Sequence, residues 1–267
     1  MIVDFHSHTT NSDGSLSTAE LVAAMERRGV AVFSITDHDS TRAYAEMPAT
    51  RARVVTGIEI NTTRDGVDVH ILGFGFSPSP DGALARTLKA NQDARRVRIR
   101  TMVERLVRAG YPLTDAMVDA EAQGSESLGR PHVAKALVRA GMVRDVQTVF
   151  NELISRSGPA YVPSTHISAP EAIDAIAKSG GVPVLAHPGR LDDYGIIDEL
   201  AERGLVGIEV FYPTHSTAQV AHFRAQAARL GLVMTAGSDF HDHRWNASVV
   251  GVEVDRGDIE PFLEMVA

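Results

Sequence analysis

The stretch DFHSHT, residues 4–9, decides both the fold and the chemistry expected of this chain. It reads as a β-strand, in which successive side chains alternate between the two faces. His6 and His8 therefore lie on one face, and Phe5 points to the other. Two imidazoles spaced in this way can both bind one metal ion. The sequence thus predicts a metal site that begins at the first strand.

The same residue types return along the rest of the chain. Apolar segments rich in β-branched residues, which are typical of strands, occupy residues 30–36, 54–60, 67–72, 182–186, 206–211 and 232–236. The candidate ligands that follow the first strand or stand in or just after these segments are Asp13, His38, Glu59, His70, His187, Asp239 and His241. In α/β barrels the loops after the strands converge on one face, where active sites lie. We therefore expect these side chains to meet at the mouth of a barrel.

Residues 73–82 interrupt the strands with a run of Gly, Ser and Pro. From residue 83 to about 161 the chain reads as helices only. A capping box at Ser168 and Glu171 then marks the return of alternating strands and helices. We expect residues 1–80 and 162–267 to form the α/β barrel, and residues 81–161 to form a small helical insertion that covers the site.

The composition excludes several classes of protein. The chain has 267 residues, no cysteine and a net charge of −8. No segment approaches the ~18 apolar residues of a membrane span, and the N-terminus does not read as a signal peptide. We expect a cytoplasmic protein with no membrane partner. An acidic chain also disfavours a long nucleic-acid track, because such a track needs many phosphate contacts.

The nine candidate ligands are enough for two or three divalent metal ions. A set of His, Asp and Glu without Cys suits Mn, Fe, Zn or Mg. Two metals ~3.5–4 Å apart can stabilise both the attacking and the leaving oxygen of a displacement at phosphorus. Glu59 or Asp239 is the expected bridge between them. The pattern indicates hydrolysis of a phosphoester by metal-activated water.

These motifs, in their order along the chain, resemble those of the PHP (polymerase and histidinol phosphatase) family. The segments that carry the resemblance are HSH at 6–8, TDHD at 36–39, GIE at 57–59, AHP at 186–188 and SDFH at 238–241. The resemblance implies a distorted (β/α)7 TIM-like barrel that holds a trinuclear metal centre. We expect Mn²⁺ there, with Fe or Zn as alternatives.

The resemblance also implies a role for each ligand. One metal would be held by His6, His8, Glu59 and Asp239, a second by Glu59, His70 and His187, and a third by Asp13, His38 and His241. Glu59, Asp239 and His187 are assigned to catalysis. Asp13 stands where histidinol-phosphatase-like members usually have a His.

Four further residues are assigned to the substrate phosphate. LGRPH at 128–132 and HPGR at 187–190 resemble the stand-alone PHP phosphoesterases, and Arg130 rests on this resemblance. Arg190 follows the expected ligand His187 by three residues, so it must lie near the metals. Arg95 shares the apolar stripe of the long insertion helix, although a solvated face is the alternative for its basic cluster. His132 is either a group near the phosphate or a capped loop histidine.

Three aromatic or acidic residues are supporting candidates. Glu209 and Tyr212, at a strand end, are expected to support the site. Trp245 either packs in the core, which is the default for Trp, or stacks on a base.

The sequence therefore predicts a metal-dependent phosphoesterase acting on a small phosphorylated nucleotide. The leading reaction is removal of the 3′-phosphate from a nucleoside 3′,5′-bisphosphate, and short 5′-phosphorylated RNA is a further substrate. A phosphatase of another metabolite, such as histidinol phosphate, is the alternative, and Asp13 argues against it. A non-catalytic metal-binding PHP module is the alternative from another class, and the complete ligand set disfavours it. An amidohydrolase would share the His-x-His strand but not the trailing pair Asp239 and His241.

Overall fold

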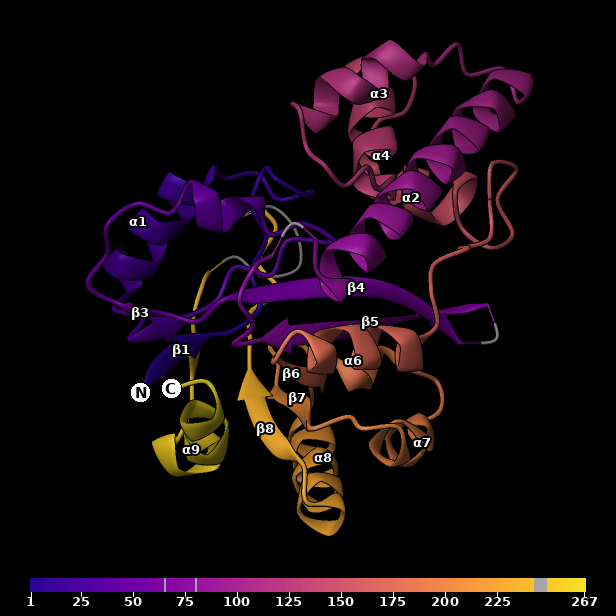
Figure 1. Ribbon diagram of the computed structural model, residues 1–267. Coiled ribbons are helices and arrows are strands. Elements are labelled where there is room, and N and C mark those ends of the chain that lie inside the picture. Colours follow the sequence, from indigo (N-terminus) through magenta and orange to yellow (C-terminus); the bar gives the residue numbers. More distant parts are fainter. Residues whose placement is uncertain (65, 80, 243–248) are drawn as a thin grey trace.

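The protein, seen in a computed structural model that describes residues 1–64, 66–79, 81–242 and 249–267, is built on two mixed sheets (Figure 1). The first has the order β3-β2-β1-β9, formed by Arg53–Val54, Val32–Phe33, Ile2–Asp4 and Val252–Glu253. The second has the order β4-β5-β6-β7-β8, formed by Gly57–Arg64, Val67–Phe74, Val182–Leu185, Gly207–Phe211 and Val233–Ala236. The predicted α/β class is confirmed.

The expected closed barrel is not seen among the described residues. The two sheets meet instead through isolated bridges, which pair Ser7 with Phe240 and His38 with Glu59. The chain leaves regular pairing where the polar motifs begin, so that β1 ends at Asp4 although the alternating pattern continued to His8. The β4–β5 hairpin and the β1–β9 pair are antiparallel, which departs from the all-parallel strands of a TIM barrel.

Helices cover the outer faces of the sheets. They are α1 (Thr18–Arg28), α6 (Ala169–Lys178), α7 (Ile196–Glu202), α8 (Thr217–Leu230) and α9 (Arg256–Met265), with short 3-10 turns η1 (Arg42–Ala45) and η3 (Pro188–Arg190). The capping box predicted at Ser168 and Glu171 is present, and the Ser168 amide donates to Glu171 Oε2 at 2.8 Å. No helix in the described ranges is both long and apolar enough to span a membrane.

The segment between β5 and α6 forms a separate group of helices, which stands above β4 in Figure 1. These helices are α2 (Ala83–Arg108), α3 (Asp115–Ala122), α4 (Arg130–Arg139), α5 (Val146–Thr148) and the π-helical turn η2 (Val149–Leu153). They share a hydrophobic core of their own, in which Leu106, Val133 and Val149 are fully buried. The segment is therefore helical as expected, and the domain limits at 81 and 161 stay a prediction.

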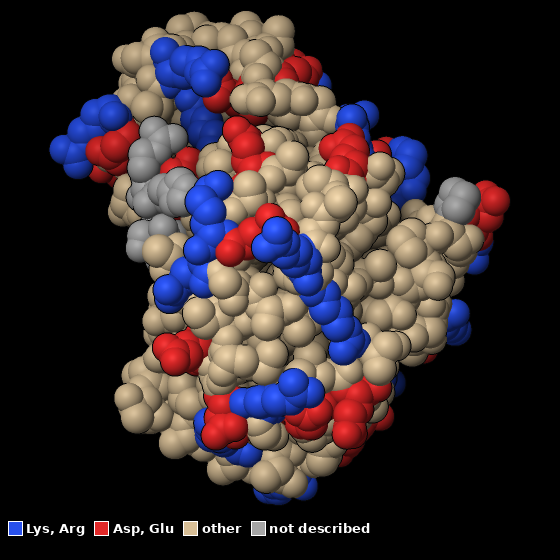
Figure 2. Space-filling model, turned by 90° about the vertical axis from the view of Figure 1, so that its left-hand side faces the viewer, with Lys and Arg blue, Asp and Glu red and all other residues tan. Residues whose placement is uncertain are grey.

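Charged side chains are mixed on the molecular face drawn in Figure 2. Lys and Arg stand there in short groups, with Asp and Glu between them, rather than in one continuous basic band.

Close packing at the centre of the fold leaves no room for a side chain at position 237. A Cβ added to Gly237 would lie 2.2 Å from the Cβ of His6 and 2.5 Å from Oε1 of Glu209. Both neighbours are completely buried, so neither can move away freely.

We predict that Gly237→Ala lowers the free energy of unfolding by about 1–3 kcal/mol, the usual cost of overpacking. Denaturant unfolding measures this difference. Gly257→Ala is the control, because its added Cβ would meet nothing closer than Asp255 Oδ1 at 3.5 Å. Equal unfolding free energies for the two variants would contradict the packing described here.

Candidate metal centre

The structure brings together the four residues expected at the first metal. The Nε2 atoms of His6 and His8 each lie 3.2 Å from Glu59 Oε2. The same two atoms lie 3.4 and 3.3 Å from Asp239 Oδ1. The sequence segments around residues 6, 59 and 239 thus converge, and one ligand atom from each of the four residues could reach a common ion.

The second group also surrounds Glu59 but differs in one member from the expected set. Glu59 Oε1 lies 2.7 Å from His70 Nδ1 and 3.2 Å from His187 Nε2. His38, expected only at the third metal, places its Nδ1 atom 3.0 Å from Glu59 Oε2. His38, Glu59 and His70 are close enough to bind one ion, with His187 beside them.

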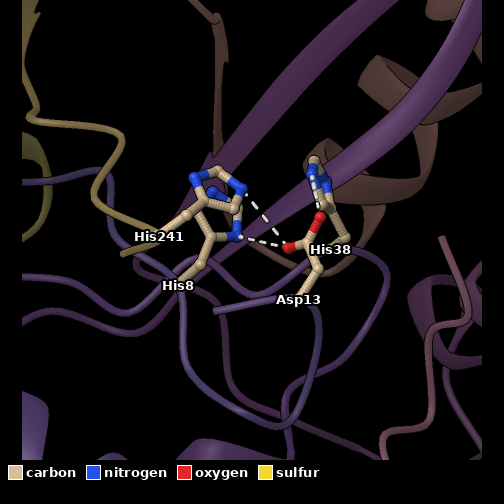
Figure 3. Close-up of side chains that lie close together, drawn as sticks. All are labelled: His8, Asp13, His38 and His241. Carbon is tan, nitrogen blue, oxygen red and sulfur yellow. Dashed lines mark ion pairs between the residues drawn. The ribbon is translucent and has the colours of Figure 1, made fainter. Parts of the chain in front are cut away.

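The third group is built around the Asp13 carboxylate, toward which imidazoles turn from three other segments (Figure 3). Asp13 Oδ1 lies 3.3 Å from His241 Nε2, and Oδ2 lies 3.9 Å from His38 Nε2. His8 adds its Nδ1 atom at 3.9 Å from Oδ1. The expected three residues are therefore joined by His8, which borders the first group through its other nitrogen.

The donor atoms suit divalent cations. Four of them are buried without a hydrogen-bond partner among the described residues, namely His6 Nε2, His8 Nε2, Asp13 Oδ1 and Glu59 Oε2. Buried polar atoms in proteins are nearly always hydrogen-bonded. Imidazole and carboxylate groups that approach one another closely without hydrogen bonds are the arrangement expected of ligands that share an ion.

The carboxylates at the centre are held in the anionic form that a cation requires. Burial raises the pKa of Glu59, but His38 and His6 outweigh this effect and keep the pKa well below its usual value. Burial acts in the same way on Asp239 and Asp13, whose pKa values are also held low by neighbouring histidines. Three anionic groups therefore lie within one buried cluster.

A second layer of side chains orients the ligands. Glu209 accepts hydrogen bonds from His6 Nδ1 at 3.0 Å and from the amide of His187 at 2.8 Å. Tyr212 donates to Asp239 Oδ2 at 3.0 Å. Both residues therefore support the site as expected from the sequence. Such partners fix the tautomer and the direction of a ligand ring.

Sequence reasoning missed two supporting carboxylates. Asp37 accepts hydrogen bonds from the hydroxyls of Thr9 and Ser12, which fixes the loop after His8. Asp4 accepts from the amide and hydroxyl of Ser238, and burial raises its pKa to about 6. Asp37 stands within the TDHD motif, which was its signal. Asp4 ends the first strand and gave none.

Backbone strain is concentrated at the same strand ends. Asp39, His187 and Asp239 have positive φ angles of 51°, 28° and 51°. For residues other than Gly, this conformation costs of order 1 kcal/mol and is typically found where function requires it. His187 and Asp239 belong to the ligand cluster, whereas the Asp39 carboxylate accepts hydrogen bonds from Asn91 and Arg95 of helix α2.

Two of the four residues expected at the substrate phosphate contact the protein itself. Arg95 donates from Nε to Asp39 Oδ2 at 2.7 Å and from Nη1 to the Leu128 carbonyl at 3.2 Å. His132 accepts from the Gly129 amide at 3.0 Å, and burial lowers its pKa to about 4. His132 is thus positioned as a capping histidine at the start of helix α4. Arg95 connects helix α2 to the loop that follows the candidate ligand His38.

The other two arginines border the ligand cluster on different sides. Arg190 places Nη2 3.0 Å from Asp239 Oδ2 and lies over the ring of Tyr212. Arg130 lies 3.6 Å from Asp68 Oδ2, and its guanidinium is 5.8 Å from the centre of the Phe150 ring. Trp245 lies outside the described residues.

Two hollows meet at the cluster. The first, here called the small cavity, has a volume of about 120 Å³ and reaches from His38 and His70 to Arg130. The second, here called the large cleft, has a volume of about 1050 Å³ and runs from Asp239 past Arg190 toward helix α4. Asp13 and Phe150 line both, so the two hollows are neighbours.

The chain is similar to three characterised enzymes along most of its length. It is 35% identical to a 3′,5′-nucleoside bisphosphate phosphatase from Chromobacterium violaceum, over 90% of this chain and 87% of that protein. It is 33% identical to a phosphoribosyl 1,2-cyclic phosphate 1,2-diphosphodiesterase from Eggerthella lenta, over 95% and 99%. It is 32% identical to the 5′-3′ exoribonuclease Rnm of Escherichia coli, over 90% and 85%.

The chain also has the same fold as a solved structure. The crystal structure of a protein from Bifidobacterium adolescentis, described as a metal-dependent phosphoesterase, matches with a TM-score of 0.88 and 30% identity. The match covers 99% of this chain and 96% of that one. No protein-family model matches the chain.

We predict that the purified protein, reconstituted with Mn²⁺, holds at least two metal ions per chain. Glu59→Gln should lower this number, because Glu59 contacts members of two ligand groups and the amide removes the charge that a cation requires. Elemental analysis after desalting measures the content, and circular dichroism checks the fold. Glu202→Gln, at an exposed position of helix α7, is the matched control. Less than one ion per chain in the unaltered protein would contradict the site.

Proposed function

The chain belongs to the PHP family of metal-dependent phosphoesterases, and on this premise we propose that it hydrolyses phosphate esters of small nucleotides. The leading substrate is a nucleoside 3′,5′-bisphosphate, which would lose its 3′-phosphate. The observation that carries this proposal is the position of the ligand groups around Glu59 and Asp13, beside two hollows that are each lined by three arginines.

Divalent metals, Mn²⁺ first and Fe or Zn as alternatives, would be held by the three groups described above. When bound, such metals polarise the phosphoryl oxygens and lower the pKa of a bound water, so that it becomes a nucleophile at neutral pH. Glu59, Asp239 and His187 are the proposed catalytic residues, since they border the point where the reacting phosphate must lie.

The arginines are proposed to neutralise substrate charge. Arginine presents a planar fork of donors that matches the oxygens of a phosphate. Arg190, beside Asp239, is placed for the reacting phosphate or its immediate neighbour. Arg130, at the junction of the small cavity and Phe150, is placed for a phosphate on the other side of the nucleoside.

The dimensions of the large cleft favour a nucleotide. Pockets for ligands of that size have volumes of ~300–1,000 Å³, and the cleft has about 1050 Å³. A short 5′-phosphorylated oligonucleotide is the second substrate we propose, because Lys135 and Arg139 of α4 add basic groups to the lining of the cleft. The names of the relatives, a bisphosphate phosphatase and an exoribonuclease, support the same two substrates.

We retain the domain division as part of this proposal. Residues 1–80 and 162–267 would be a distorted (β/α)7 barrel, in which the isolated bridges connect the two sheets. Residues 81–161 would be a helical lid over the site. The packing of α2 against the loop after His38 supports this role, since Arg95 and Gln92 both donate to Asp39.

We predict that Mn²⁺-loaded protein releases phosphate fastest from a nucleoside 3′,5′-bisphosphate in a panel of phosphoesters. Histidinol phosphate and simple sugar phosphates should be poor substrates, because they lack a second phosphate. A chelator should abolish all hydrolysis. A faster rate on histidinol phosphate would favour the metabolite phosphatase, and inactivity on the whole panel would favour a non-catalytic module.

We predict that kcat/KM falls as 5′-phosphorylated oligonucleotides grow beyond a few nucleotides, with a shallow dependence on salt. Each extra phosphate contact steepens the logarithmic salt slope by ~0.7 for a single strand. The net charge of −8 disfavours a long series of such contacts, and the face drawn in Figure 2 carries no continuous basic band. One series of lengths at two ionic strengths gives both quantities. Rates that rise with length and collapse with salt would instead indicate a true nucleic-acid track.

A further inference from the structure

The small cavity is lined by a positively charged side chain, Arg98, that belongs neither to the ligand groups nor to the four residues expected at the substrate phosphate. Arg98, on the inner face of α2, is 9% exposed and lines the cavity together with Arg130 and His166. Its Nε atom donates to the Val162 carbonyl at 3.0 Å, and Nη1 lies 3.4 Å from the Ser164 hydroxyl.

Arg98 has no carboxylate within ion-pair distance in the described part of the chain, unlike the other two arginines of the cavity. Arg95 is paired with Asp39 and Arg130 with Asp68. A buried charge without a close counter-charge is costly, and an anion bound in the cavity would offset that cost. Of the three arginines that line the cavity, Arg98 is therefore the one that forms no ion pair among the described residues.

The guanidinium groups of the cavity shift the pKa values of their titratable neighbours. Burial and the nearby Arg130 lower the pKa of Arg98 to about 10, which leaves it charged at neutral pH. Burial, Arg95 and Arg98 lower the pKa of His166 to about 2, so that its ring is neutral. The Nδ1 atom of that ring is buried without a hydrogen-bond partner in the described ranges. The cavity thus favours an anion over a cation or an apolar group.

The size and position of the cavity define the anion. About 120 Å³ is well below the ~300–1,000 Å³ of pockets that hold a drug-sized ligand, so a phosphate group fits but a nucleoside does not. The metal-ligand candidates His38 and His70 line the cavity, and Asp13 and Phe150 connect it to the large cleft. An anion here would be the immediate neighbour of the reacting phosphate.

We propose that the small cavity binds the non-reacting 5′-phosphate of the substrate, with Arg98 as its buried counter-ion and Arg130 as its outer clamp. This inference rests on the proposed function and extends it. The nucleoside would lie at the junction near Phe150, with its 3′-phosphate at the ligand groups. The cavity would then select substrates with a single 5′-phosphate, because a 5′-hydroxyl leaves Arg98 unpaired and a 5′-triphosphate exceeds the volume.

The decisive comparison uses two substrates that differ only in this phosphate. For the Mn²⁺-loaded enzyme, Arg98→Met should lower kcat/KM about tenfold or more on a nucleoside 3′,5′-bisphosphate, the usual effect of losing a charged hydrogen bond. The nucleoside 3′-monophosphate should be hydrolysed by the variant as it is by the unaltered enzyme. Arg108→Met, on the same helix but 75% exposed, is the matched control and should change neither rate.

Two further measurements keep the test decisive if Arg98→Met folds poorly. Arg98→Lys keeps the charge but not the fork of donors, so the preference for the bisphosphate should weaken without disappearing. A nucleoside 5′-monophosphate should raise the unfolding temperature of the holoenzyme more than the nucleoside does, and Arg98→Lys should reduce this difference.

Equal losses on both substrates would overturn the inference, because Arg98 would then serve the fold or the reacting phosphate. No loss on either would also overturn it. If the unaltered enzyme hydrolyses no bisphosphate, the proposed function fails, and the two unfolding shifts still decide whether the cavity binds a 5′-phosphate.

Discussion

The burial of the Glu59 carboxylate among imidazoles is the constraint on which the rest of the structure depends. This side chain is completely buried and lies 2.7–3.2 Å from nitrogen atoms of five histidines, His6, His8, His38, His70 and His187. Removing an ionised group from water costs several kcal/mol unless positive charge compensates it. Histidines from both ends of the chain must therefore lie around Glu59. This requires the two sheets to meet beyond the ends of their regular strands, where the histidines stand.

The supporting contacts show how this meeting is secured. Asp4, at the end of β1, is bonded to Ser238 and to the amide of Gly251, so the first strand fixes the segment that presents Asp239. Glu209 similarly joins His6 to His187. These acidic groups bind no candidate ion themselves but determine where the ligands point, which is the usual division of labour at metal sites.

Sequence reasoning found the candidate ligands because the same residue types recur at strand ends, and the structure brings these side chains together around Glu59 and Asp13. It failed where side-chain direction depends on distant contacts. His38 contacts Glu59 as well as Asp13, and it is followed by Asp39, which adopts a positive φ that the sequence does not announce. Arg95 shares the apolar stripe of its helix, yet its partner Asp39 lies 56 positions away. Nothing in the local pattern of either segment indicates that partner. The sequence also does not indicate whether the barrel closes. Closure depends on the register of short strands, and β2 and β3 have only two residues each.

The attachment of α2 to Asp39 also bears on how such enzymes can diversify. Asn91 and Arg95 hold the Asp39 carboxylate, and Asn91 also donates to the carbonyl of Asn61, whose amide contacts His38. Hydrogen bonds therefore connect the helical insertion directly to the residues that contact the candidate ligands. An insertion transplanted from a relative would need matching groups at these helix positions, or it would alter the ligand geometry together with the substrate preference. New substrate specificities should therefore arise more readily through changes in helices α3 and α4 than through changes near Asn91 and Arg95 of α2.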